Sequence, residues 1–327
     1  MRRRHLPVLA ALAAFATSSE SRAQQPAWPS RTIRIIVTFP PGGSSDIVAR
    51  VLAEVLSQRL PQRVIVENRP GAGGTLGAAY VASQPADGYT LMLSNTAPIV
   101  TSPPIYANVP YDPVTGFSHI AYIGATPLVI VVNPRLVPAT DLAGLVAWIK
   151  AQPAPPGFGS SGAGSVAHIF GEAFTARTGA QLTHVPYRGS APMQADLLGG
   201  AIPLSFDTLP QNVENICAGR LRAIAITAPA RQEMAPEVPT TAEAGFPGLE
   251  AYTWHMVMAP KGTPANVVQT VNQAFMRVAA EAAVQQRLSD LAMRLVTDST
   301  PESAAAWLRD ETQKWSSVVR EANITVN

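Results

Sequence analysis

The sequence predicts an α/β fold of two units, each a mostly parallel β-sheet flanked by helices. Short β-branched runs alternate with segments in which apolar residues recur at helical spacing. The alternation restarts after a long β-rich stretch at 120–132, and a second strand-like stretch follows at 251–259. We therefore expect two extended segments to join the units. A ligand cleft would then lie between them, where strands end and helices begin.

Local patterns predict the elements in chain order. The β-branched run 33–37 indicates the first strand, and the amphipathic run 46–60 indicates the first helix. The same patterns predict strands at 63–66, 89–94, 158, 182–187, 202–206 and 221–227, and helices at 75–83, 142–151, 165–178, 190–198, 210–218, 265–291 and 301–322.

Residues 1–23 have the pattern of a secretory signal. Three arginines precede an apolar stretch of 11 residues, and Ser21-Arg22-Ala23 is a small-x-small cleavage site. We expect export by the general or the twin-arginine route, followed by removal of the signal. The signal carries four arginines and one glutamate, so its removal turns the formal charge of +2 into −1 and leaves no indication of nucleic-acid binding. Cys217 is the single cysteine, which excludes an internal disulfide.

The junction Phe39–Asp46, FPPGGSSD, is the most informative segment. It joins the first strand to the first helix through Pro-Gly-Gly-Ser-Ser, which leaves several backbone N–H groups open to an anion. Ser44 or Ser45 is the expected N-cap, and Gly43 allows a ligand to approach the backbone. Asp46 is either a structural cap or a partner for a ligand's ammonium or hydroxyl group.

Two later junctions repeat this pattern. Gly159–Ser165 places hydroxyl groups and glycines before a helix that carries His168, a residue that either donates to a ligand or caps its own helix. In Tyr187-Arg188-Gly189-Ser190, the Arg188 guanidinium either pairs with a carboxylate or lies on the surface. Asp207 follows a further strand, at the same expected sheet edge or as a cap for the next helix.

Several enzyme motifs are incomplete. Leu76 stands where a dinucleotide fingerprint needs glycine, the loop before Ser165 lacks the lysine of a phosphate loop, and Ala163 interrupts a GxSxG elbow. The five histidines form no close metal-ligand pair, so neither a metal nor a cofactor is expected. The profile is that of a binding protein rather than an enzyme. An exported serine hydrolase using Ser161 or Ser165 with His168 is the alternative.

The chain resembles the Bug/TctC family, the extracytoplasmic receptors of tripartite tricarboxylate transporters. The similar segments are FPPGGSSD (Phe39–Asp46), VIVENRPGAGGTLGA (Val64–Ala78), ADGYTLML (Ala86–Leu93), VPYDPVTGF (Val109–Phe117), VVNP (Val131–Pro134), SSGAGSVAH (Ser160–His168), HVPYRGSAP (His184–Pro192), DLLGG (Asp196–Gly200), VPTTAEAGFPGLE (Val238–Glu250) and MAPKGTP (Met258–Pro264). They occur in order over almost the whole mature chain.

The resemblance implies a periplasmic, monomeric flytrap protein with two lobes of the periplasmic-binding type. Domain 1 would comprise 24–123 and 253–327, and domain 2 would comprise 124–252. A small carboxylate would be clamped between them, and the closed form would dock on the membrane components of the transporter or on a sensor kinase. The implied ligand-binding residues are Phe39, Gly43, Ser44, Ser45, Asp46, Thr75, Ser94 and Asn95 from one lobe, and Ser160, Ser161, Ser165, His168, Arg188 and Asp207 from the other.

Overall fold

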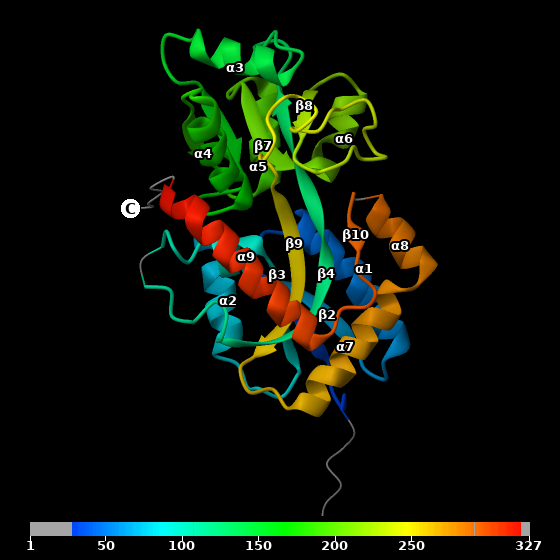
Figure 1. Ribbon diagram of the computed structural model, residues 1–327. Coiled ribbons are helices and arrows are strands. Elements are labelled where there is room, and N and C mark those ends of the chain that lie inside the picture. The colour runs from blue at the N-terminus through cyan, green and yellow to red at the C-terminus, as the bar shows by residue number, and fades with distance from the viewer. Residues whose placement is uncertain (1–27, 107, 291, 322–327) are drawn as a thin grey trace, which may run out of the picture.

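The computed structural model describes residues 28–106, 108–290 and 292–321, with side chains described up to residue 315. The predicted signal at 1–23 lies outside these residues. Figure 1 shows two lobes stacked end to end, with the long strands β4 (Phe117–Val132) and β9 (Tyr252–Pro260) at the junction. No helix in the described ranges is both long enough and apolar enough to span a membrane.

The lower lobe in Figure 1 is built on the sheet β2-β1-β3-β9-β4. Strands β1, β2 and β3 are parallel, β9 runs antiparallel to β3, and β4 runs antiparallel to β9. Besides β4 and β9, this lobe contains β1 (Ile33–Val37), α1 (Ser44–Arg59), β2 (Val64–Asn68), the short 3-10 helix η1 (Ala72–Gly74), α2 (Thr75–Ala82), β3 (Thr90–Asn95), the helical turn η2 (Ala97–Thr101), α7 (Ala265–Ala279), α8 (Ala282–Ser289), β10 (Arg294–Leu295) and α9 (Pro301–Glu321).

The upper lobe is built on a second sheet, in which β4 pairs with β7 and β8, and β5 lies between β7 and β6. β5 is parallel to both of its neighbours, whereas β4 is antiparallel to β7 and β8. The elements are α3 (Leu142–Lys150), β5 (Gly157–Ser160), α4 (Val166–Thr178), β6 (Thr183–Pro186), α5 (Ser190–Gly199), β7 (Leu204–Thr208), α6 (Leu209–Cys217) and β8 (Arg222–Ile226).

Alternating side chains of the strands divide between the two faces of each sheet, and one cluster continues across both lobes. In β1, Ile33 and Ile35 pack with Leu52 of α1 and Phe275 of α7, whereas Ile36 belongs to the cluster on the opposite face. The same alternation divides the strand residues of the upper lobe between α4 on one face and α5 and α6 on the other.

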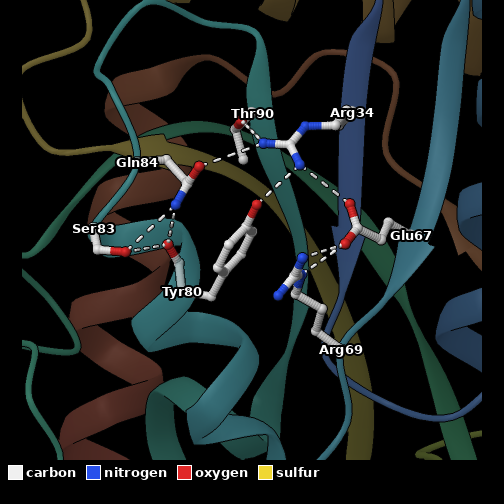
Figure 2. A network of polar contacts seen from close by, with 7 residues as sticks. All are labelled: Arg34, Glu67, Arg69, Tyr80, Ser83, Gln84 and Thr90. Atoms are coloured by element: carbon white, nitrogen blue, oxygen red, sulfur yellow. Dashed lines mark hydrogen bonds and ion pairs between the residues drawn. The ribbon is translucent and has the colours of Figure 1, made fainter.

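A polar network ties the parallel strands of the lower lobe to α2 (Figure 2). The Arg34 guanidinium donates to Tyr80 Oη at 2.9 Å, to Thr90 Oγ1 at 3.0 Å and to Glu67 Oε2 at 3.2 Å. Arg69 donates to Glu67 Oε1 at 2.7 Å, and its guanidinium lies 3.6 Å from the centre of the Tyr80 ring. Since Arg69 directly precedes the turn into η1, this network fixes a segment that reaches the cleft.

One predicted element is wrong in its extent. The helix expected over 265–291 is interrupted, because Glu281 adopts extended backbone angles (φ −69°, ψ 126°) as the N-cap of α8. Its carboxylate accepts two hydrogen bonds from the Arg59 guanidinium of α1, at 2.8 and 2.9 Å. The break lets α7 and α8 each pack on α1, a tertiary constraint that the helical spacing of apolar residues does not reveal.

Gly124, in β4 close to the junction of the lobes, offers a test of this architecture. Its φ is +146°, and a Cβ placed there would lie 2.3 Å from the carbonyl oxygen of Arg294 in β10. We expect Gly124→Ala to lower the free energy of unfolding by roughly 2–4 kcal/mol, through steric overlap and backbone strain. Gly199→Ala is the control, because no atom lies within 4 Å of its added methyl group. Equal denaturation midpoints for the two variants would contradict this expectation.

Candidate functional site

A cavity of about 130 Å³ lies between the two lobes. Its wall combines the segment after β1 and the end of β3 in one lobe with the starts of α4, α5 and α6 in the other. The lining residues are Phe39, Pro40, Pro41, Gly42, Gly43, Ser44, Ser45, Asn95, Ala97, Leu128, Ser161, Ser165, Val166, Ala167, Arg188, Gly189, Ser190, Ala191, Pro192, Asp207, Thr208 and Thr253. A volume of this size fits a molecule about as large as benzene, which occupies an apolar cavity of about 150 Å³ in another protein.

The first lobe contributes the start of α1. Gly43 is the N-cap and no side chain caps the helix, so the prediction of Ser44 or Ser45 as N-cap is wrong. The N–H groups at the start of a helix have no intrahelical acceptor, and those of Ser44 and Ser45 therefore remain open at the cavity wall. The arrangement suits an anion.

Asp46 supports this loop from behind. Its carboxylate accepts hydrogen bonds from Gly42 N at 3.0 Å, Arg50 Nε at 3.0 Å and Asn68 Nδ2 at 2.9 Å. Burial opposes the charge, but these bonds hold the pKa of Asp46 below its usual value. Asp46 does not line the cavity. Of the two roles that the sequence allowed, the contacts match the structural one.

The second lobe contributes the glycine-rich loop before α4. Ser165 is the N-cap, and its Oγ accepts a hydrogen bond from His168 N at 3.2 Å. The N–H groups of Val166 and Ala167, the first two residues of α4, then lie at the cavity wall without an intrahelical acceptor. Ser161 lines the same wall.

Two stacked histidine rings contact this loop and stabilise it. The rings of His168 and His184 stack with their centroids 3.8 Å apart. His168 Nδ1 accepts from Gly164 N at 3.2 Å, and His184 Nε2 lies 2.7 Å from Ser160 Oγ. Burial lowers the pKa of His168 to about 4 and that of His184 to about 3. Both rings are therefore neutral at pH 7 because of burial.

Arg188 and Asp207 carry the charges of the cavity wall. Asp207 is buried, its carboxylate accepts from Ser190 Oγ at 2.8 Å and Asn212 Nδ2 at 3.2 Å, and burial raises its pKa to about 6. The Arg188 guanidinium is exposed and has no hydrogen-bond or ion-pair partner among the described residues. The guanidinium is thus available to an anion in the cavity.

A second cavity of about 600 Å³ adjoins the first. The two share Phe39, Pro40, Ser161, Arg188 and Gly189. The larger cavity extends over the turn into η1 on one lobe and toward Tyr106 and Tyr187. Arg188 therefore stands where the compartments meet, within reach of a ligand in either.

The structure brings nine of the fourteen predicted ligand-binding residues to the smaller cavity: Phe39, Gly43, Ser44, Ser45, Asn95, Ser161, Ser165, Arg188 and Asp207. Five lie outside its wall: Asp46, Thr75, Ser94, Ser160 and His168. Thr75 Oγ1 donates to Ala72 O, Ser94 Oγ donates to Asn95 O, and Ser160 Oγ contacts His184. These hydroxyl groups stabilise the backbone around the cleft.

Residues from β9 and the start of α6 were missed. Thr253 pairs with Thr126 across the β9–β4 register, and this pairing brings it to the cavity wall. The sequence held no signal for it, because the register of strands more than a hundred residues apart decides which side chains reach the cleft. Thr208, beside the predicted Asp207, could have been found as the next residue of that strand end. In the described part of the chain, no three His, Cys, Asp or Glu side chains are placed to hold a metal ion.

Comparison with known proteins identifies the family. Residues 48–324 match the model of the TctC family, described as the tripartite tricarboxylate transporter family receptor. The chain belongs to this family. Protein BugT of Bordetella pertussis is 40% identical to this TctC receptor over 295 residues, which cover 90% of each chain.

Solved structures share the fold of this TctC receptor. Rpa4515 of R. palustris with adipate superposes with a TM-score of 0.86 at 33% identity, over 91% of this chain and 99% of that chain. MatC of Rhodopseudomonas palustris with bound malate superposes with a TM-score of 0.84 at 28% identity, over 89% of this chain and all of the other. The fold is therefore the two-lobed fold of periplasmic binding proteins, as predicted, but its sheets are mixed rather than mostly parallel, because β4 and β9 run antiparallel to their neighbours. The receptor belongs to a family of solute-binding proteins.

The raised pKa of Asp207 predicts a pH dependence of stability. The folded protein holds this proton up to about pH 6, whereas the ordinary pKa is 3.8, so folding favours the protonated form. The Asp207 contribution to stability is therefore greatest below pH 4 and is lost as the pH rises to 6, by roughly 3 kcal/mol at 1.36 kcal/mol per unit. Asp207→Asn should remove this contribution to the difference between the free energies of unfolding that urea titrations give at pH 4 and pH 7. Parallel pH profiles for wild type and variant would refute the assignment.

Proposed function

We propose that this protein is a periplasmic receptor that captures a small organic acid between its lobes and presents it to the membrane components of a tripartite tricarboxylate transporter. The observation that carries the proposal is the unpartnered Arg188 guanidinium beside the open N–H groups of α1 and α4. Donors from two lobes face one cavity, and a carboxylate is the small group that accepts from all of them. The adipate and malate held by relatives of the same fold support this ligand class.

The cavity of about 130 Å³ accommodates one end of a small acid, and the adjoining cavity of about 600 Å³ accommodates what extends beyond it. The malate and adipate held by relatives make acids of four to six carbons the first candidates. Asp207 is the acidic side chain on the described wall, and its raised pKa shows that a negative charge is disfavoured there. A bound carboxylate would raise that pKa further, so binding would be accompanied by proton uptake. An acid with two carboxylates could reach both Arg188 and the start of α1.

The mechanism is closure of the two lobes about β4 and β9. We propose that the lobes correspond to domain 1, at 24–123 and 253–327, and domain 2, at 124–252. An acid that contacts both lobes binds the closed arrangement better than the open one and so shifts the population toward it. The closed arrangement then presents the surface that the transporter recognises.

The geometry does not favour the hydrolase alternative. Ser165 Oγ accepts from the backbone N–H of His168 and not from its ring. The ring uses Nδ1 to accept from Gly164, and its low pKa makes it a poor general base at pH 7. Ser161 has no hydrogen bond to a histidine among the described residues.

The ligand class can be tested on purified protein. We expect malate, adipate or an acid of similar length to raise the melting temperature and to reduce the radius of gyration in solution scattering. Ligand at 100 times its Kd stabilises the folded state by about 2.7 kcal/mol, which corresponds to several degrees. The uncharged diamide of adipic acid is the matched control and should change neither quantity. If C4 to C6 dicarboxylates leave both quantities unchanged, the proposal is wrong.

Arg188 should decide the affinity for these acids. Arg188→Gln removes a charge-assisted, two-pronged contact, and we expect the Kd of the bound acid to rise at least tenfold in calorimetry. The Kd of Arg188→Lys should lie between those of Arg188→Gln and the wild type, because lysine keeps the charge but loses the fork geometry. Arg220→Gln is the charge-matched control, since Arg220 pairs with Glu214 and lies off the cavity. Equal losses in the two glutamine variants would show a general effect of charge.

A further inference from the structure

His255 is a buried polar residue that lies directly behind the cavity wall. The β3–β9 register places it opposite Asn95, and both side chains reach Ser45 in the first turn of α1. His255 Nε2 lies 3.1 Å from Ser45 Oγ, and Asn95 Nδ2 donates to the same oxygen at 3.0 Å. His255 is completely buried, and its Nδ1 has no hydrogen-bond partner in the described part of the chain.

The orientation of the Asn95 amide is fixed. Its Oδ1 accepts from Ala97 N at 3.0 Å, so its Nδ2 is the atom that faces Ser45. One lone pair of Ser45 Oγ is therefore occupied by an N–H donor. What the Ser45 hydroxyl offers to the cavity then depends on the tautomer of His255.

The two neutral tautomers have opposite consequences. If Nδ1 carries the proton, Ser45 must donate to Nε2, and a buried N–H is left without an acceptor. If Nε2 carries the proton, it donates to Ser45 Oγ, and Nδ1 is left as an unpaired acceptor. In folded proteins, a buried N–H group without an acceptor is rarer than a buried acceptor without a donor. The surroundings therefore favour the proton on Nε2. Ser45 Oγ then accepts two hydrogen bonds, and its own proton is free to point into the cavity that Ser45 lines.

We propose that His255 is a positioning residue which, through its Nε2–H, presets the Ser45 hydroxyl as a donor to the ligand and so favours a carboxylate oxygen at this position of the cavity. The inference rests on the proposed function and deepens it. With the N–H groups of Ser44 and Ser45, the start of α1 presents donors, while the Asp46 carboxylate is turned to Gly42, Arg50 and Asn68. In this first turn, the Ser44 hydroxyl is then the remaining side-chain acceptor for an amide or ammonium group of a ligand.

The tautomer can be measured without any ligand. In a protein labelled with ¹⁵N at histidine, long-range ¹H–¹⁵N correlation spectra separate protonated from unprotonated ring nitrogens. We expect the His255 ring to show a protonated Nε2 and an unprotonated Nδ1. A protonated Nδ1 would overturn the inference and leave the proposed function untouched. Conversely, a receptor that binds none of the acids would refute the proposed function while the spectrum still decides the tautomer.

The positioning role is tested by measuring how tightly two His255 variants bind malate and adipate. His255→Leu removes the donor and should raise the Kd of the bound acid at least tenfold, whereas the side-chain amide of His255→Gln can donate near the Nε2 position and should raise it less than threefold. In a Ser45→Ala background, His255→Leu should change the Kd less than twofold, because His255 acts through Ser45. Equal losses in both backgrounds would show that His255 acts by another route and would overturn the inference. Melting temperatures identify a variant that fails to fold. In that case the tautomer measured in the wild type decides whether the inference holds.

Discussion

The antiparallel pairing of β4 with β9 is the constraint on which the rest of the molecule depends. Both strands run through the junction of the lobes, and β4 exchanges β9 for β7 and β8 as its partners at Leu128. Because the register is fixed, Thr253 reaches the cavity wall and His255 lies behind it. The β10 strand adds to β4 at Gly124, a position without room for a side chain. The strands that join the lobes therefore also shape the floor of the site.

The electrostatics of the cleft follow from where the helices begin. α1, α4 and α5 start at one cavity, and each directs N–H groups without intrahelical acceptors toward it. Arg188 adds a full positive charge, and the acidic Asp207 is so buried that its protonated form is favoured up to about pH 6. The positive ends of three helices and Arg188 thus act on a site whose acidic wall residue, Asp207, is mostly ionised at pH 7 but has its charge disfavoured by burial.

The sequence predicted this site in part, and the division has a physical reason. A strand followed by Gly-Ser and a helix is a local pattern, and parallel strands end at one edge, so Gly43, Ser161 and Arg188 could be placed near one another. The inward turn of Asp46 depends on Arg50 and Asn68, and the Ser45–His255 contact joins residues 210 positions apart. Such contacts depend on strand register and tertiary packing. For the same reason the break at Glu281, which contacts Arg59 of another helix, could not be read from helical spacing.

In both lobes, a neutral histidine contacts a serine of the strand–helix junction. In the first lobe, His255 on β9 contacts Ser45, and in the second, His184 on β6 contacts Ser160 at 2.7 Å. A neutral imidazole can offer one donor and one acceptor without placing a charge beside an anion site, which a lysine or a carboxylate could not do. Burial keeps the pKa of each ring at about 3, so neither contact changes over the pH range of the periplasm. The Ser45 hydroxyl at the cavity wall is thereby fixed in the free protein, whereas the Ser160 hydroxyl, which lies outside the wall, fixes the loop before α4.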